Sequence, residues 1–198
     1  MHGRTWIGAM VFAAALPALA ATAGQTAPDF KLTDTQGKAV ELSDFKGKYV
    51  VLEWTNPACP FVDNHYNTRN MQSLQQLWGP RGVVWLAIDS SSRSSGDYLP
   101  PAQLGEWMRA RGAAQRAVLA DPDSGVARLY QAKTIPHMFV IDPAGTIIYA
   151  GAIDDRPSTR PEDPPAAHNY VRAALTEATQ GMAVTTTGST PYGCSIKY

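Results

Sequence analysis

Residues 50–62, VVLEWTNPACPFV, combine an apolar run, an Asn-Pro turn and a single cysteine followed directly by proline. The run Val50–Trp54 is rich in β-branched residues and predicts a buried strand. Proline is favoured at the first position of a helix, because its missing N–H would have no partner within the helix. The stretch therefore predicts a strand, a tight turn and a helix that begins at Pro60, with Cys59 at or beside its N-cap.

Cys59 is the first candidate for chemistry. The free N–H groups and the positive end of the dipole at a helix N-terminus favour a thiolate and lower the pKa of a thiol. This position makes Cys59 a candidate nucleophile. The alternatives are a small buried hydrophobic residue or one half of a structural disulfide.

Length and net charge limit the number of domains and the classes of partner that the chain can have. The chain has 198 residues, with 17 basic and 17 acidic side chains. This length fits one domain with a full hydrophobic core. The balanced charge gives no electrostatic case for binding nucleic acid or an anionic membrane. We expect no cofactor and no dedicated metal site.

The N-terminus has the pattern of a secretory signal. Residues 6–20 form an apolar, alanine-rich run after a weakly positive start, and small residues offer cleavage after Ala20 or Ala23. We expect residues 1–23 to be a signal peptide, with no stable membrane insertion after its cleavage and a periplasmic or secreted product. A retained membrane anchor is the alternative. In an oxidising compartment, Cys59 and Cys194 can form one bond or remain two free thiols.

Periodicity and turn chemistry predict an α/β domain over residues 24–180 and a polar, irregular tail over residues 181–198 that carries Cys194. Strand–helix alternation predicts a parallel core, and a closing hairpin adds antiparallel strands. The predicted strands are 30–33, 39–42, 49–54, 83–89, 117–120, 137–141 and 146–150, and the predicted helices are 60–78 with a break within 64–70, 101–110, 124–130 and 167–179.

Several motifs resemble one family. The segments APDF at 27–30 and LSDFKGK at 42–48, with the Trp-ended strand and the Cys-Pro helix start, resemble the peroxiredoxin-like redoxins (AhpC/TSA type) of the thioredoxin-fold superfamily. Thr134-Ile135-Pro136 and the hairpin after it resemble that fold's cis-proline loop. The resemblance covers about residues 27–151. It implies a thioredoxin-like fold with a central mixed sheet flanked by helices and an N-terminal β-hairpin.

Shorter motifs are similar to a peroxiredoxin-like subgroup of that family. They are EWTNP at 53–57, PHM at 136–138, GAID at 151–154 and YGCSIKY at 192–198.

Two departures limit how far the family's chemistry carries over. Thioredoxins have Cys-x-x-Cys; here Cys59 matches the first cysteine and Val62 stands at the second. Peroxiredoxins place a threonine or serine three residues before the peroxidatic cysteine, a position that holds Asn56 when counted from Cys59. The peroxidatic cysteine itself aligns with Val62. A local dithiol is therefore absent, and the peroxidase site is not carried over.

The resemblance implies roles for four residues. Cys59 is the attacking thiolate, and Cys194 is the resolving partner, with a static disulfide or two unpaired thiols as alternatives. Pro136 is expected to be cis, to pack against Cys59 and to present backbone groups to an extended substrate. Glu53 matches the buried acid that assists proton transfer in thioredoxins. An exposed acid, or one paired with a lysine, is the alternative for Glu53.

The histidines carry a weaker hypothesis. His65 and His137, with Met138 and Cys59, offer the thiolate, thioether and imidazole ligands that suit a soft metal such as copper. Their spacing matches no recognised ligand motif, so the more ordinary interpretation is a helix-surface histidine and a loop histidine. His168 is expected to cap the last helix or to face solvent near it.

These observations favour an exported thiol–disulfide oxidoreductase that acts on a protein or small-molecule thiol or disulfide. A peroxiredoxin-like thiol peroxidase, with peroxide as substrate, is a second enzyme hypothesis. A non-catalytic redoxin scaffold with a structural disulfide or a soft-metal site is an alternative from a different class.

Overall fold

The computed structural model describes residues 21–198. Residues 1–20, which hold most of the expected signal peptide, lie outside the described residues. Within the described part, no helix has the length and apolar character needed to cross a bilayer. The elements in chain order are β1 (Lys31–Asp34), β2 (Ala39–Glu41), η1 (Leu42–Phe45), β3 (Val50–Trp54), α1 (Pro60–Asn67), α2 (Asn70–Trp78), η2 (Gly79–Arg81), β4 (Val84–Asp89), α3 (Pro101–Ala110), β5 (Ala117–Ala120), α4 (Gly125–Tyr130), β6 (Thr134–Ile135), β7 (His137–Ile141), β8 (Ile147–Gly151), α5 (Asp163–Ala166), α6 (Tyr170–Thr179) and β9 (Cys194–Ser195).

The central sheet has seven strands in the order β2-β1-β5-β4-β3-β7-β8. β3 pairs in parallel with β4 and antiparallel with β7, as the predicted mixed sheet requires. All five residues of β3 are buried, because both faces of this strand are covered. The predicted N-terminal hairpin is confirmed, since β1 and β2 pair antiparallel.

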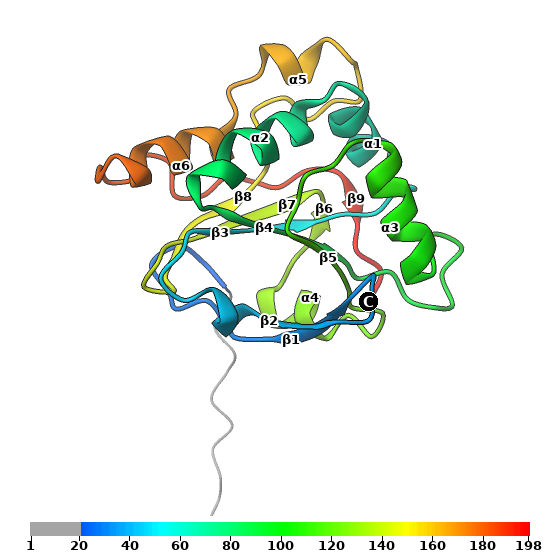
Figure 1. Cartoon of the computed structure of the whole chain (residues 1–198). Coiled ribbons are helices and arrows are strands. Elements are labelled where there is room, and N and C mark those ends of the chain that lie inside the picture. The colour runs from blue at the N-terminus through cyan, green and yellow to red at the C-terminus, as the bar shows by residue number, and fades with distance from the viewer. Residues whose placement is uncertain (1–20) are drawn as a thin grey trace, which may run out of the picture.

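Helices cover both faces of the sheet. In Figure 1, α1, α2 and α6 lie above the sheet and α4 lies below it. α3 packs beside α1, where the Trp107 and Tyr66 ring centroids are 5.1 Å apart. At the C-terminal end of β3, Trp54 packs against Tyr130 of α4 and Phe139 of β7, at centroid distances of 5.4 and 5.3 Å. This aromatic cluster thus lies directly before the loop that follows β3.

The long helix predicted after Cys59 is broken where the sequence indicated. α1 ends at Asn67, and Arg69, which precedes α2, has a left-handed φ of 60°. Side chains such as asparagine, which bond to nearby backbone groups, are poor in a helix interior and account for this break.

The tail returns across the sheet end to a short strand. Ala150 of β8 forms an isolated parallel bridge with Gly188. β9 then pairs antiparallel with β6, with Cys194 opposite Ile135 and Ser195 opposite Thr134. In Figure 1 this orange-to-red segment runs past β8 and β7 to β9, which lies beside β6. The predicted irregular tail thus contains one two-residue strand, and that strand carries the second cysteine.

Candidate redox site

The site lies where β3 ends and β7 begins. Because these strands are antiparallel, Trp54 at the end of β3 pairs with His137 at the start of β7. The loop from β3 to α1 therefore lies beside the loop that contains Pro136. Cys59 Sγ is 3.2 Å from the carbonyl oxygen of Ile135. The sheet topology thus brings the predicted nucleophile to the predicted proline loop.

Cys59 is the N-cap residue of α1, and Pro60 is its first helical residue, as predicted. The cysteine is only 3% exposed. Asn56 holds the turn before it: its Oδ1 accepts from Ala58 N at 2.6 Å, and its Nδ2 donates to the carbonyl oxygen of Asp97 at 3.1 Å. This is the N-terminal position on which the expectation of a reactive thiolate rests, and the reactivity of Cys59 stays a prediction.

Cys59 and Cys194 form a disulfide, with their Cα atoms 5.9 Å apart. The alternative of two unpaired thiols is therefore wrong for this structure, because no described cysteine is free. The β6–β9 pairing explains how so distant a residue reaches the site: it places Cys194 directly opposite Ile135, whose carbonyl oxygen lies against Cys59.

Pro136 follows Ile135 through a cis peptide bond, as the resemblance implies. On the other side of this loop, Gly193 has a φ of +123°, which side chains on L-residues rarely adopt. A Cβ built on Gly193 would lie 2.0 Å from the carbonyl oxygen of Ile135 and 3.2 Å from Cδ of Pro136. Glycine is therefore required for β9 to approach the proline loop this closely.

Gly193→Ala is expected to weaken the docking of β9 on β6 by about 1–3 kcal/mol, because the new methyl group collides with backbone and the φ is strained. Hydrogen exchange of the Ile196 amide, which donates to the carbonyl oxygen of Lys133 at 3.2 Å, measures this docking. Gly181→Ala is the matched control, because Gly181 also has a positive φ, of 73°, but has open space around its Cβ position. Equal exchange of the Ile196 amide in both variants would contradict the expectation.

Glu53 is fully buried, so the alternative of an exposed or lysine-paired acid is wrong. Its carboxylate accepts from Tyr66 Oη at 2.9 Å, from Trp85 Nε1 at 2.7 Å and from Gln75 Nε2 at 3.5 Å. Burial raises the pKa of Glu53 to about 7, and these hydrogen bonds limit the rise. The raised pKa agrees with the expectation, but Glu53 bonds to α1, α2 and β4 and to neither cysteine. Its role in proton transfer to Cys59 stays a prediction.

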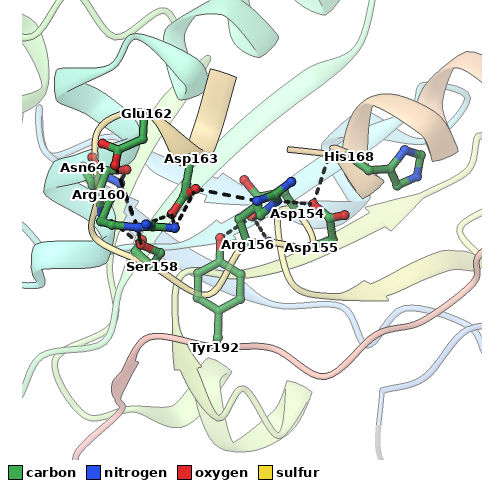
Figure 2. Close-up of polar contacts among 10 residues, drawn as sticks. All are labelled: Asn64, Asp154, Asp155, Arg156, Ser158, Arg160, Glu162, Asp163, His168 and Tyr192. Carbon is green, nitrogen blue, oxygen red and sulfur yellow. Dashed lines mark hydrogen bonds and ion pairs between the residues drawn. The ribbon is translucent and has the colours of Figure 1, made fainter. Parts of the chain in front are cut away.

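Tyr192 is a site residue that sequence reasoning did not single out. Its hydroxyl donates to Asp154 Oδ1 at 2.5 Å and lies 3.1 Å from His65 Nε2. Figure 2 shows the ring reaching from the tail to Asp154 at the start of the 154–168 loop. Both partners are buried. The only sequence signal was the occurrence of YGCSIKY and GAID among the subgroup motifs, which does not indicate contact between them.

Little space remains beside the disulfide. A cleft of about 50 Å³ is lined by residues 90–92 and 195–197 together with both cysteines. Binding pockets for small molecules are commonly about 300 Å³ or more. Larger hollows of about 680 and 520 Å³ lie away from both cysteines. The oxidised site is therefore closed, and access to Cys59 requires the tail to move.

The soft-metal arrangement is not formed. His65 is fully buried and its two ring nitrogens contact Tyr192 and Asn70, so its expected surface position is wrong. His137 is buried in β7, and its Nδ1 accepts from Lys133 N at 3.2 Å. Burial lowers the pKa of each histidine to about 4. Residues 21–198 contain no cluster of three or more His, Cys, Asp or Glu residues that could hold a metal ion. His168 is exposed just before α6, as predicted.

Comparison with known proteins places these features in a family. The sequence model described as "AhpC/TSA family" matches residues 23–150. Thiol-disulfide oxidoreductase ResA of Bacillus subtilis (strain 168) is 29% identical over 132 residues, which cover 63% of this chain and 64% of ResA. Peroxiredoxin Bcp of the same strain is 45% identical over 60 residues, 26% of this chain and 38% of Bcp. The chain thus spans just under two thirds of ResA.

Solved structures match more of the chain. An uncharacterized conserved protein from Geobacillus kaustophilus has a TM-score of 0.75 and 27% identity, covering 90% of this chain and 93% of that one. A hypothetical protein from Sinorhizobium meliloti 1021 has a TM-score of 0.76 and 26% identity, covering 89% and 94%. A putative thiol:disulfide interchange protein DsbE from Chlorobium tepidum, at 23% identity and a TM-score of 0.57 over 79% and 96%, shares the fold. The predicted thioredoxin-like fold is confirmed.

Proposed function

The chain belongs to the AhpC/TSA family, and from this premise we propose that it is a thiol–disulfide oxidoreductase in which Cys59 is the nucleophile and Cys194 the resolving thiol. One observation carries the proposal: the only two cysteines of the chain form a disulfide at the N-terminus of α1. The similarity to ResA supports the same class of reaction.

The proposed cycle begins with the reduced protein. The Cys59 thiolate attacks one sulfur of a substrate disulfide, forms a mixed disulfide with that half and releases the other half as a thiolate. The Cys194 thiolate then attacks Cys59 Sγ, which releases the second half of the substrate. The substrate gains two electrons, and the protein is left with the Cys59–Cys194 disulfide. Exchange is reversible, so the reduction potentials of the partners set its direction.

Reopening the disulfide starts at the more accessible sulfur. Cys194 is partly exposed, whereas Cys59 is 3% exposed. An incoming thiolate attacks Cys194 Sγ and forms a mixed disulfide there, and Cys59 leaves as a thiolate that the helix N-terminus stabilises. A lower pKa of the leaving thiol speeds this step. A second thiolate of the reductant then attacks the reductant's sulfur in that mixed disulfide, which frees Cys194 and leaves the reductant oxidised. Pro136 is proposed to hold the loop in which Ile135 contacts Cys59, and Glu53 is the proposed proton donor and acceptor beneath α1.

Peroxide reduction is not part of the proposal. The position where the resemblance places a peroxidatic cysteine holds Val62, which is fully buried in the core. The similarity to Bcp covers 60 residues and does not supply that cysteine.

Export completes the proposal. The signal pattern of residues 1–23 and the disulfide both fit an oxidising compartment, in the periplasm or outside the cell. The mature protein would then consist of the 24–180 domain and the 181–198 tail. Determining the N-terminal sequence of protein purified from an exporting host tests this point.

Cys194→Ser is expected to leave a Cys59 thiol whose labelling rate reaches half its maximum about one pH unit below that of a short unstructured cysteine peptide, because the helix N-terminus raises its thiolate fraction. The pH of half-maximal rate is the readout, since the docked tail slows labelling at every pH alike. Stopped-flow labelling over a range of pH measures it, and Cys59→Ser is the matched control, since it leaves the tail cysteine, which should titrate as the peptide does. A half-maximal pH for Cys59 no lower than that of the peptide would remove the proposed function.

A further inference from the structure

Tyr192 lies two residues before Cys194 and fastens that part of the tail to the domain. Its ring centroid is 5.8 Å from that of Phe61 in α1. Its hydroxyl lies between two buried groups, Asp154 Oδ1 at 2.5 Å and His65 Nε2 at 3.1 Å. Neither partner belongs to the tail: His65 is on α1, and Asp154 follows β8. None of these contacts involves either cysteine.

The direction of the hydrogen bonds forms a consistent chain. Asn70 Nδ2 donates a hydrogen bond to His65 Nδ1 at 2.9 Å, so the neutral ring carries its proton on Nε2 and donates to the Tyr192 oxygen. The tyrosine then donates to the Asp154 carboxylate. Burial keeps the pKa of His65 low, which maintains the neutral ring that this chain needs.

The hydroxyl of Tyr192 is one of only two hydrogen-bond donors to the side chain of Asp154 among the described residues. Asp154 is 1% exposed, and Arg156 N is the other donor to Oδ1, at 3.0 Å. Its Oδ2 has no hydrogen-bond partner among the described residues. A buried carboxylate that loses a donor incurs a large desolvation cost, so loss of the tyrosine hydroxyl is unfavourable. The strength of this contact, two residues from the cysteine, distinguishes it from the main-chain contacts of β9.

We propose that Tyr192 is a positioning residue for the redox pair: bound between Asp154 and His65, it keeps Cys194 opposite Cys59 after the disulfide is reduced. This role rests on the proposed function and explains how Cys194 reaches the mixed disulfide at Cys59 and releases the substrate from it. With Tyr192 bound, Cys194 attacks the mixed disulfide at Cys59 as an intramolecular thiol of high effective concentration. Without it, the reduced tail leaves, and that concentration falls.

The test uses the full mature chain and its equilibrium with glutathione. Tyr192→Phe keeps the ring against Phe61 and removes only the hydroxyl. Because a hydrogen bond to a charged group changes an equilibrium constant by about tenfold or more, we expect the constant for forming Cys59–Cys194 to fall about tenfold. The rate at which Cys194 resolves a Cys59–glutathione disulfide should fall by a similar factor.

Tyr49→Phe is the matched control. The Tyr49 hydroxyl donates to the carbonyl oxygen of Ala178 at 2.9 Å. Tyr49 precedes β3, whereas the redox site lies at the C-terminal end of that strand, so loss of this hydroxyl should lower stability without changing either exchange measurement. The double variant Tyr192→Phe/Asp154→Asn adds a direct readout: if the two side chains act through one hydrogen bond, its effect should be smaller than the product of the single effects.

The outcomes separate the two proposals. A tenfold fall in Tyr192→Phe with no change in Tyr49→Phe supports the positioning role. If the exchange constant and the rate of resolution by Cys194 are the same in Tyr192→Phe as in Tyr49→Phe, the positioning role is overturned and the proposed function is unaffected. Reduced wild type that forms no Cys59–Cys194 disulfide on incubation with glutathione disulfide overturns the proposed function as well.

Discussion

Reduction of the Cys59–Cys194 disulfide is expected to lower the free energy of unfolding by roughly 5 kcal/mol. The bond joins residues 135 positions apart, so it closes most of the chain into one loop. In the chain-entropy treatment, a loop of this length strongly restricts the unfolded state, and the restriction disappears when the bond opens. Urea unfolding of the oxidised protein, with and without a reductant, measures the difference.

The control for this prediction is the double variant Cys59→Ser/Cys194→Ser. It should unfold at the same urea concentration with and without the reductant, and near that of the reduced wild type. A wild-type difference below about 2 kcal/mol would contradict the prediction, because it would mean that the unfolded chain gains little conformational entropy when the disulfide opens. The comparison also measures how far redox state controls the stability of the whole domain.

Glu53→Gln is expected to remove a pH dependence of stability worth about 3 kcal/mol. The folded protein raises the pKa of Glu53 from 4.5 to about 7, because the carboxyl group is fully buried. The folded state therefore binds its proton more tightly than the unfolded state. The stabilisation is fully present below about pH 4.5 and is lost as the pH rises to about 7. In the variant a neutral amide replaces the protonated acid, so this fall should disappear.

The measurement is urea unfolding at several values between pH 4.5 and pH 8, with the disulfide kept oxidised. The variant should be more stable than the wild type at pH 8 and similar to it at pH 4.5. Glu106→Gln is the control, because this side chain is 75% exposed and should leave the wild-type curve unchanged. A Glu53→Gln curve parallel to that of the wild type would show that the buried carboxylate is not the source of the pH dependence.

Local signals in the sequence accounted for the fold and the first half of the site. Val50–Trp54 predicted the strand and Pro60 the helix start, because an apolar run and a proline at the first helical turn are signals contained within a short stretch of sequence. The cis form of Pro136 came from family resemblance, since the motif and not the bond's intrinsic preference predicted it. These features were confirmed.

The second half of the site depends on contacts between distant segments. β9 has two residues, and no periodicity in so short a strand could predict its pairing with Ile135. His65 was expected on a helix surface, because a short polar helix gives no indication that Tyr192 will cover that face. The burial of Glu53 was undecided for a related reason: a strand covered on both faces has no polar side from which to judge an acid.

The pairing of β9 with β6 also affects how the molecule behaves among its own copies. β6 is a short strand whose edge is occupied by β9, and an unpaired edge is a template for another chain. The same departure of the tail that frees Cys59 would therefore expose an open strand edge beside a reactive thiol. Such exposure is confined to reduced molecules in which Tyr192 has released the tail, and there intermolecular strand pairing and disulfide-linked dimers would become competing products. A docked tail would then limit self-association, and the proposed Tyr192 contact would extend that protection to the reduced protein.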